Sequence, residues 1–314
     1  MYQNKKVLLI AGSGTLGEYT MLELLRLGVE HIDIICIEDL ISDDPRVSYY
    51  KGDAMAYSYL EEFLAERHYD GIVNFLHYNN PNIYPIVHRL LMKRCDHLIF
   101  LSSYRVYADE QHPITEAAPK LLDVLSDTVF LKNEQYAMPK TWCEHYMAST
   151  AEDHWTVVRP VISFSKRRFD LVTHTGAALL DKMAAGETVP LPIEAKNLVA
   201  GLDWAGNSGK LIANLLFKPA AFREAFTVST AQNLTWEQVA ELYVELFGLT
   251  YEWVSTEEYL KATNRFNYDA FQYDRMYNRL IDNRKILEVT GLTAEDFTPI
   301  KEGLRIEKVR YEAK

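Results

Sequence analysis

The sequence predicts an α/β fold built on a doubly wound parallel sheet, and two observations carry this prediction. Short and almost wholly apolar runs begin at KKVLLIA (5–11), as expected for strands that are buried on both faces of a sheet. Segments with helical periodicity separate these runs, and strands that alternate with helices form right-handed βαβ units. The N-terminal half therefore predicts a sheet covered by helices on both sides.

The expected elements follow one another in a regular order. After the first strand, a glycine-rich turn leads into a helix that stops at Gly28. Helices are also expected at 59–68 and 83–94. The further strands that we expect are HIDIICIE (31–38), VSYYKGD (47–53), DGIVNFL (70–76), HLIFLSS (97–103) and WTVVRPVI (155–162).

The alternation loosens after the last of these strands. Helical patterns at 170–186, 206–217 and 235–247 are separated by short runs such as FTVST (226–230) and YEWVS (251–255). This pattern of helical segments and short strand-like runs predicts a smaller mixed α/β region that binds substrate. We expect residues 1–165 to form the Rossmann-type cofactor domain and residues 166–314 to be mainly this second region, interleaved with the last strands of the sheet.

The composition excludes several classes of protein. A net charge of −11 in 314 residues argues against nucleic acid as a partner, because binding phosphates needs clustered cations. No apolar run reaches the roughly 18–20 residues that span a bilayer. Cys36, Cys95 and Cys143 lie far apart, and the histidines form no ligand pattern, so neither disulfides nor a metal site are expected. A cytoplasmic enzyme is the expectation.

The turn after the first strand has the G-x-G-x-x-G pattern in the required context, between a strand and a helix. Gly12 would make the tight turn, Gly14 would let the backbone approach a pyrophosphate, and Gly17 would let the helix pack closely. The diphosphate would then contact backbone N–H groups at the positive end of the helix. The candidate residues of this site are Gly12, Ser13, Gly14, Thr15, Leu16 and Gly17.

Glu38 ends the second strand, a little over twenty residues beyond the glycines. An acid at that point can accept hydrogen bonds from the ribose hydroxyls of adenosine. Its charge would repel the additional phosphate of NADP, so NAD is favoured over NADP as cofactor. Asp39 is an alternative for this role, and a merely solvated acid is the simpler interpretation.

The segment EQYAMPK (134–140) places Tyr136 four residues before Lys140, which puts both on one helix face. A phenol with its ordinary pKa of about 10 is too weak a base at neutral pH. The ammonium and an oxidised nicotinamide ring would both lower that pKa, and each nearby positive charge is worth about 1–3 units. Lys140 would also hold the nicotinamide ribose. Pro139 requires the helix to begin nearby.

A hydroxyl that fixes the substrate oxygen is expected from LSSYRVY (101–107), at the carboxyl end of a strand where open α/β sheets bind ligands. Ser103 is the candidate, and its neighbours Ser102 and Tyr104 are candidates for contacts with substrate. The basic run at 166–168 includes Arg167 and Arg168, which suit a compact anion such as a sugar-nucleotide diphosphate. A solvated loop is the alternative for this run.

These motifs together make the chain resemble the extended short-chain dehydrogenase/reductases, the group of NAD-dependent sugar-nucleotide epimerases, dehydratases and reductases. The glycine turn, the acid at the strand end, Gly52-Asp53, the serine strand, Y-x-x-x-K and Arg159-Pro160 occur in that family's order. The resemblance implies that Ser103, Tyr136 and Lys140 are catalytic. It also implies that Asp53, with Ala54 beside it, contacts adenine.

The chain departs from the family at several points. Leu76, His77 and Tyr78 stand where small residues are usual, so Leu76 and His77 would narrow the site or contact nicotinamide. His77 is alternatively a second acid or base, or a packed ring. Phe164 and Asn207 also replace usual residues. An insertion at 121–133 is expected to form a loop or helix over the site.

The resemblance implies an NAD-dependent epimerase or related oxidoreductase of a nucleotide-linked sugar, with a homodimer through helices that flank the sheet. A 4,6-dehydratase is disfavoured, because Ser103-Tyr104-Arg105 replaces the Thr-Asp-Glu of that subclass. Two alternatives stay open. One is an NAD(P)-dependent reductase or dehydrogenase of a small carbonyl or hydroxyl compound, and the other is a non-catalytic NAD-binding sensor or scaffold.

Overall fold

The computed structural model describes residues 2–80, 82–263 and 271–313. Within these residues, the central sheet has seven strands in the order β12-β6-β5-β4-β1-β2-β3, and every neighbouring pair is parallel. The strand order reverses between β1 and β4, where the carboxyl ends of parallel strands open a crevice for ligands. The strands are β1 (Lys6–Ile10), β2 (His31–Cys36), β3 (Val47–Lys51), β4 (Gly71–Asn74), β5 (Leu98–Leu101), β6 (Trp155–Pro160) and β12 (Glu224–Val228).

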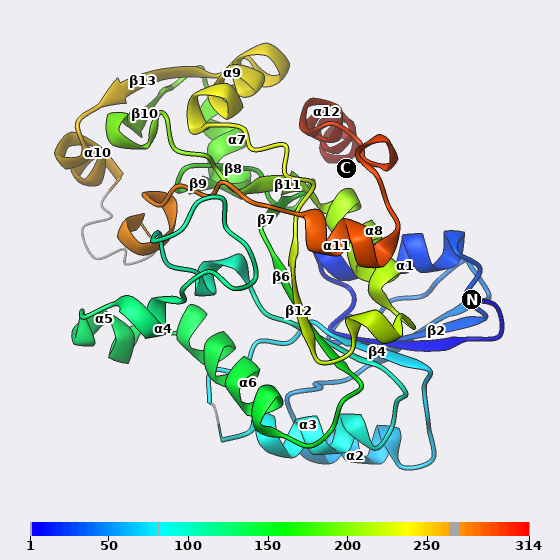
Figure 1. Ribbon diagram of the computed structural model, residues 1–314. Helices are drawn as coiled ribbons and strands as arrows, with labels where there is room; N and C mark the ends of the chain where they lie inside the picture. Colours follow the sequence, from blue (N-terminus) through cyan, green and yellow to red (C-terminus); the bar gives the residue numbers. More distant parts are fainter. Residues whose placement is uncertain (1, 81, 264–270, 314) are drawn as a thin grey trace.

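Helices cover both faces of this sheet, as Figure 1 shows. On one face lie α2 (Tyr57–Leu64), α3 (Tyr84–Met92) and α6 (Ala137–Ser149). On the other lie α1 (Thr15–Arg26), α8 (Ala205–Leu215) and α11 (Arg284–Thr290). The predicted doubly wound α/β fold is therefore confirmed.

The alternation of side chains along β1 explains why the strand is apolar throughout. Leu8 and Ile10 belong to the core beneath α2, α3 and α6, whereas Val7 and Leu9 belong to the core beneath α1 and α8. All four side chains are fully buried. A strand that is covered on both faces favours apolar residues at successive positions.

A smaller mixed region lies beyond the carboxyl edge of the sheet (Figure 1). Its strands pair in twos: β10 (Thr188–Pro192) with β13 (Thr250–Val254), β11 (Leu202–Trp204) with β7 (Ile162–Phe164), and β8 (Asp170–Leu171) with β9 (His174–Thr175). Its helices include α7 (Gly176–Ala184), α9 (Trp236–Phe247), α10 (Thr256–Thr263) and α12 (Ile300–Glu312). The boundary between 165 and 166 stays a prediction.

The expected helix at 170–186 is wrong in its first half. Residues 170–175 form the antiparallel pair β8–β9, and the helix begins only at Gly176. Val172 has a φ of +52° and Gly176 a φ of +61°, so the backbone turns twice where a continuous helix was expected. Apolar spacing alone did not reveal these turns.

In the described ranges, none of the helices combines the length and apolar character needed to cross a bilayer.

Candidate active site

A cavity of about 420 Å³ lies at the carboxyl edge of the sheet. Ala11, Phe75 and Leu101 line it from the ends of β1, β4 and β5, which places it at the reversal of strand order. The glycine turn, the serine strand and Tyr136 all reach this one cavity. Its other lining residues are Gly14, Thr15, Leu16, Gly17, Ser102, Ser103, Tyr104, Arg105, Tyr136, Pro160, Val161, Ile162, Ser163, Arg168, Asp274 and Arg275.

The glycine turn has the shape that a diphosphate requires. A Cβ on Gly17 would lie 2.2 Å from the carbonyl oxygen of Gly12, and a Cβ on Gly12 would lie 2.6 Å from Leu9 Cβ. Gly14 differs, because a Cβ there would meet only Ala11 O, at 3.8 Å, and would otherwise fill open space. Gly14 is the N-cap of α1 and supplies no side-chain cap. The first N–H groups of the helix therefore remain available to an anion.

Glu38 lies beside this turn. The Ser13 hydroxyl donates a 2.8 Å hydrogen bond to Glu38 Oε2, and this bond lowers the pKa of the Glu38 carboxyl. Asp39 is strongly exposed and lies 3.6 Å from the ammonium of Lys51. Asp53 accepts a hydrogen bond from the backbone N–H of Met55, and Ala54 is buried. Neither of these last two residues lines the cavity, so their assignment to adenine stays a prediction.

Tyr136 is the N-cap residue of α6, and its half-buried side chain lines the cavity. The carboxylate of Glu134 fixes this start of the helix, because Oε2 accepts hydrogen bonds of 2.9 Å from the N–H groups of both Tyr136 and Met138. Pro139 consequently falls in the first turn, where a missing N–H costs nothing. The helix thus begins near Pro139, as the sequence requires.

Lys140 follows one turn later and is buried. Its Nζ donates to the carbonyl oxygens of Leu76, at 3.1 Å, and of Leu101. Burial lowers the pKa of the Lys140 ammonium to about 8, and the buried groups of Cys143 and Glu144 offset part of this effect. The ammonium thus fastens α6 to the ends of two neighbouring strands.

Ser103 and Ser102 have different surroundings although they are adjacent. Ser103 is the N-cap of a short 3₁₀ helix, η1 (Tyr104–Val106), and its oxygen accepts a 3.2 Å hydrogen bond from the N–H of Arg105. Among the residues that the structure describes, no acceptor binds the hydroxyl proton of Ser103, which is thus available to a ligand in the cavity. The hydroxyl of Ser102 instead donates to the buried carboxylate of Glu144. Of the two serines, Ser103 is therefore the better placed to orient a substrate oxygen.

His77 packs against the candidate base. Its ring lies 5.1 Å from the ring of Tyr136, and its Nε2 contacts the carbonyl oxygen of Gln135 at 2.7 Å. Burial lowers the pKa of the His77 imidazole. Leu76 contributes the carbonyl that Lys140 binds. Neither residue lines the cavity, and a direct contact with nicotinamide stays a prediction for both.

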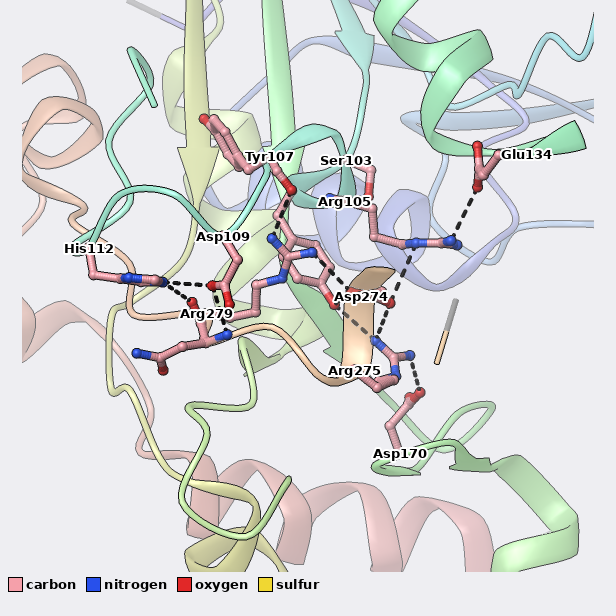
Figure 2. A network of polar contacts seen from close by, with 12 residues as sticks. Ser103, Arg105, Tyr107, Asp109, His112, Glu134, Asp170, Asp274, Arg275 and Arg279 are labelled. Atoms are coloured by element: carbon pink, nitrogen blue, oxygen red, sulfur yellow. Dashed lines mark hydrogen bonds and ion pairs between the residues drawn. The ribbon is translucent and has the colours of Figure 1, made fainter. Parts of the chain in front are cut away.

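A network of arginines and carboxylates borders the cavity on the side of the mixed region (Figure 2). Its centre is Asp274, whose carboxylate accepts hydrogen bonds from Tyr104 at 2.8 Å and from Arg275 at 2.7 Å. Arg105 and Arg279 approach the same carboxylate at 3.4 and 3.5 Å. Burial alone would raise the pKa of Asp274, but these arginines outweigh it and lower that pKa.

The two arginines of the predicted basic run lie apart. Arg168 lines the cavity and pairs with Asp170 at 2.7 Å. Arg167 does not line it. Its guanidinium donates a 2.7 Å hydrogen bond to the carbonyl oxygen of Ser13, on the glycine turn. The structure therefore places Arg167 at the cofactor turn, whereas the sequence assigned it to substrate.

A second buried charge cluster lies beneath the serine strand. Glu144 on α6 binds Arg159 at 2.7 Å and Lys120 at 2.8 Å, and it also accepts the hydroxyl of Ser102. Burial would raise the pKa of Glu144, but Arg159 and Lys120 hold it at about 2. This cluster joins α6, β5 and β6 behind the cavity.

Several residues of the site were not found from sequence. Asp274 and Arg275 lie about 140 residues beyond Tyr136 and carry no motif. Glu134 begins the Tyr-Lys segment but belongs to no motif. Arg105 stands where the dehydratase subclass has an acid, which disfavours that subclass but does not by itself indicate a binding role.

The fold is that of an extended short-chain dehydrogenase/reductase. The family model of the NAD dependent epimerase/dehydratase family matches residues 7–199, and the chain belongs to this family. The NAD cofactor predicted from the sequence agrees with this membership. Among curated proteins, the UDP-glucose 4-epimerase of Lacticaseibacillus casei is 31% identical over 74 residues. That match covers 22% of this chain and 22% of the relative.

Solved structures share the fold over nearly the whole chain. An epimerase from Methanothermobacter thermautotrophicus has a TM-score of 0.73 and 14% identity, and the match covers 99% of this chain and 93% of that one. The UDP-glucose 4-epimerase of Thermotoga maritima with UDP-glucose has a TM-score of 0.71 and 15% identity, covering 98% of both chains. The dTDP-glucose 4,6-dehydratase of Bacillus anthracis with NAD has a TM-score of 0.70 and 18% identity, covering 99% and 97%.

Proposed function

We propose that this protein is an NAD-dependent epimerase, or a related oxidoreductase, that acts on a nucleotide-linked sugar. One observation supports it above the others: Tyr136, Ser103 and the glycine turn line a single cavity, with the ammonium of Lys140 buried behind it. These are the groups that proton removal and hydride transfer at a carbinol require.

The chain's residues fit NAD at one end of the cavity. The N–H groups that follow Gly14 would bind the diphosphate, and Glu38, already oriented by Ser13, would accept the ribose hydroxyls of adenosine. A bound NAD would supply the hydride chemistry of the reaction at the carbinol carbon. Lys140 has its ammonium close to the end of β4, one turn along α6 from Tyr136.

The remaining residues act on the proton and on the orientation of substrate. The phenolate oxygen of Tyr136 would take the proton of the substrate hydroxyl and become the phenol, and Ser103 would donate a hydrogen bond to the same substrate oxygen. Glu134 keeps Tyr136 at the start of α6 by binding the N–H groups of the first turn. Within the cavity wall, Arg168 and Arg275 would supply positive charge for the anionic diphosphate of the substrate.

A nucleotide sugar as substrate rests on the family and on the structures that share the fold. Two of these proteins are named for UDP-glucose and dTDP-glucose. A 4,6-dehydratase is disfavoured, because Arg105 faces Tyr136 where that subclass has an acid. The homodimer and a cytoplasmic location stay predictions.

The test is to incubate the NAD-loaded protein with a panel of nucleotide sugars and to follow both sugar configuration and absorbance at 340 nm. An epimerase inverts one carbon without a lasting change in nicotinamide absorbance. A reductase or dehydrogenase changes that absorbance in proportion to product. Binding of NAD with neither change in any substrate would favour the non-catalytic alternative.

A further inference from the structure

Arg105 occupies an unusual place for a cation. It belongs to η1, directly after the serine strand, and its guanidinium carbon lies 4.8 Å from the centre of the Tyr136 ring. Its side chain is 20% exposed and lines the same cavity as Ser103 and Tyr136. Any group that Arg105 binds inside the cavity therefore lies close to the ring of Tyr136.

The hydrogen-bonding capacity of Arg105 is largely unused. Arginine has five N–H donors. Its Nη2 donates to Glu134 at 3.2 Å, but its buried Nε makes no hydrogen bond and lies 3.4 Å from Asp274. Its Nη1 contacts no acceptor in the ranges 2–80, 82–263 and 271–313. A partly buried guanidinium with so few acceptors is a favourable site for an oxygen anion.

The two nearby carboxylates are already engaged by other donors. Glu134 Oε2 accepts both N–H groups at the start of α6. Asp274 accepts Tyr104 and Arg275 at shorter distances than it holds Arg105. Glu134 thus offers Arg105 only Oε1, and both acids are shared with other donors. Positive charge therefore persists at this point of the cavity wall, in a chain whose net charge is −11.

We propose that the sugar unit of the substrate carries a carboxylate and that Arg105 binds it. This inference rests on the proposed function. In a nucleotide-linked hexose that reacts at C4, the diphosphate is attached at C1, across the ring. An anion beside Tyr136 must then belong to the sugar itself, and the substituent next to C4 is the C6 carbon on C5. A C6 carboxylate matches the planar fork of a guanidinium, whereas a neutral hydroxymethyl group does not.

The simpler interpretation is that Arg105 has only a structural role. Through Glu134 it supports the start of α6, and a substitution would then harm every substrate alike. The distinction is experimental, because two substrates that share one nucleotide and differ only at C6 isolate the contact with Arg105.

The experiment compares UDP-glucuronate with UDP-glucose, and their C4 epimers, on the NAD-loaded protein. It measures Kd by calorimetry and kcat/KM from the ratio of epimers. We expect the wild type to favour the uronate at least about tenfold. Arg105→Gln should weaken the binding of UDP-glucuronate by about 10–100-fold, the range for hydrogen bonds to a charged group. It should weaken the binding of UDP-glucose by less than about threefold. Arg105→Lys should retain part of the preference.

Arg305→Gln is the matched control, because Arg305 is an exposed arginine on α12 that pairs with Glu302, away from the cavity. This variant should leave Kd and kcat/KM unchanged for both substrates. A wild-type preference for UDP-glucose, or equal losses for both substrates in Arg105→Gln, would overturn the inference. Interconversion of the neutral pair alone would leave the proposed function standing. If neither pair is interconverted, the Kd values still decide the role of Arg105.

Discussion

The ammonium of Lys140 donates a 3.1 Å hydrogen bond to the carbonyl oxygen of Leu76, just beyond β4, and a second bond to the carbonyl oxygen at the end of β5. One buried charge thus fixes the helix that carries Tyr136 against the edge of the sheet where the cavity opens. This arrangement links the position of the candidate base to the protonation of a single amine.

Activity is therefore expected to fall as pH rises through about 8, the pKa to which burial lowers the Lys140 ammonium. Above that pH the amine is neutral, and its hydrogen bonds to the two carbonyl oxygens lose the strength that the charge adds. The measurement is the pH profile of kcat at saturating NAD. A profile of Lys140→Met that declines over the same interval would show that another group controls it.

The lowered pKa of Lys140 also makes the free energy of unfolding depend on pH. The pKa of Lys140 is lower in the folded state than in the unfolded chain, so the unfolded chain binds more protons between about pH 8 and 10.5. The contribution of Lys140 to the free energy of unfolding should consequently rise with pH in that window. Urea titrations of wild type and Lys140→Met at several pH values measure it. A constant difference between the two proteins would contradict the prediction.

Glu144→Gln should destabilise the protein by about 3–5 kcal/mol, because it leaves Arg159 buried without its anionic partner. Urea unfolding at pH 7 measures this loss, and Arg305→Gln, on the surface, should stay within about 0.5 kcal/mol of wild type. The folded pKa of Glu144, at about 2, is depressed, so its stabilisation is present above its unfolded pKa and is lost as pH falls toward 2. A Glu144→Gln variant as stable as wild type would contradict this view.

Glu38→Gln should weaken the binding of NAD more than the binding of NADP. The carboxylate is expected to accept the ribose hydroxyls in NAD and to repel the additional phosphate in NADP. Because Ser13 donates to Glu38, Ser13→Ala should shift the preference in the same direction but less. Fluorescence titration with both cofactors checks this, and equal losses for NAD and NADP would remove Glu38 as the selector.

The sequence predicted the parts of the site that depend on local pattern. The glycine turn follows a buried strand and opens a helix, so its position was readable from thirty residues. Ser103 and Tyr136 lie at the carboxyl edge of the same parallel sheet, which the strand order brings together. Elements with a strong period were also found, although their ends moved by a few residues.

The remaining residues could not be predicted because long-range packing places them. Asp274 reaches the cavity from a segment that shows no strand or cofactor motif, and its partners Tyr104 and Arg105 are about 170 residues earlier in the chain. Arg167 and Arg168 are adjacent in sequence but bind different parts of the protein: Arg167 binds the glycine turn and Arg168 binds Asp170. Only the tertiary structure distinguishes two neighbouring arginines in this way.

The most direct test of the catalytic assignment is Tyr136→Phe, which removes one hydroxyl and keeps the ring against which Arg105 and His77 pack. We predict that kcat with the identified sugar substrate falls by about 10²–10⁴-fold, the usual contribution of a positioned acid or base, while the Kd for NAD changes by less than about threefold. Turnover that survives this substitution at close to the wild-type rate would contradict the account.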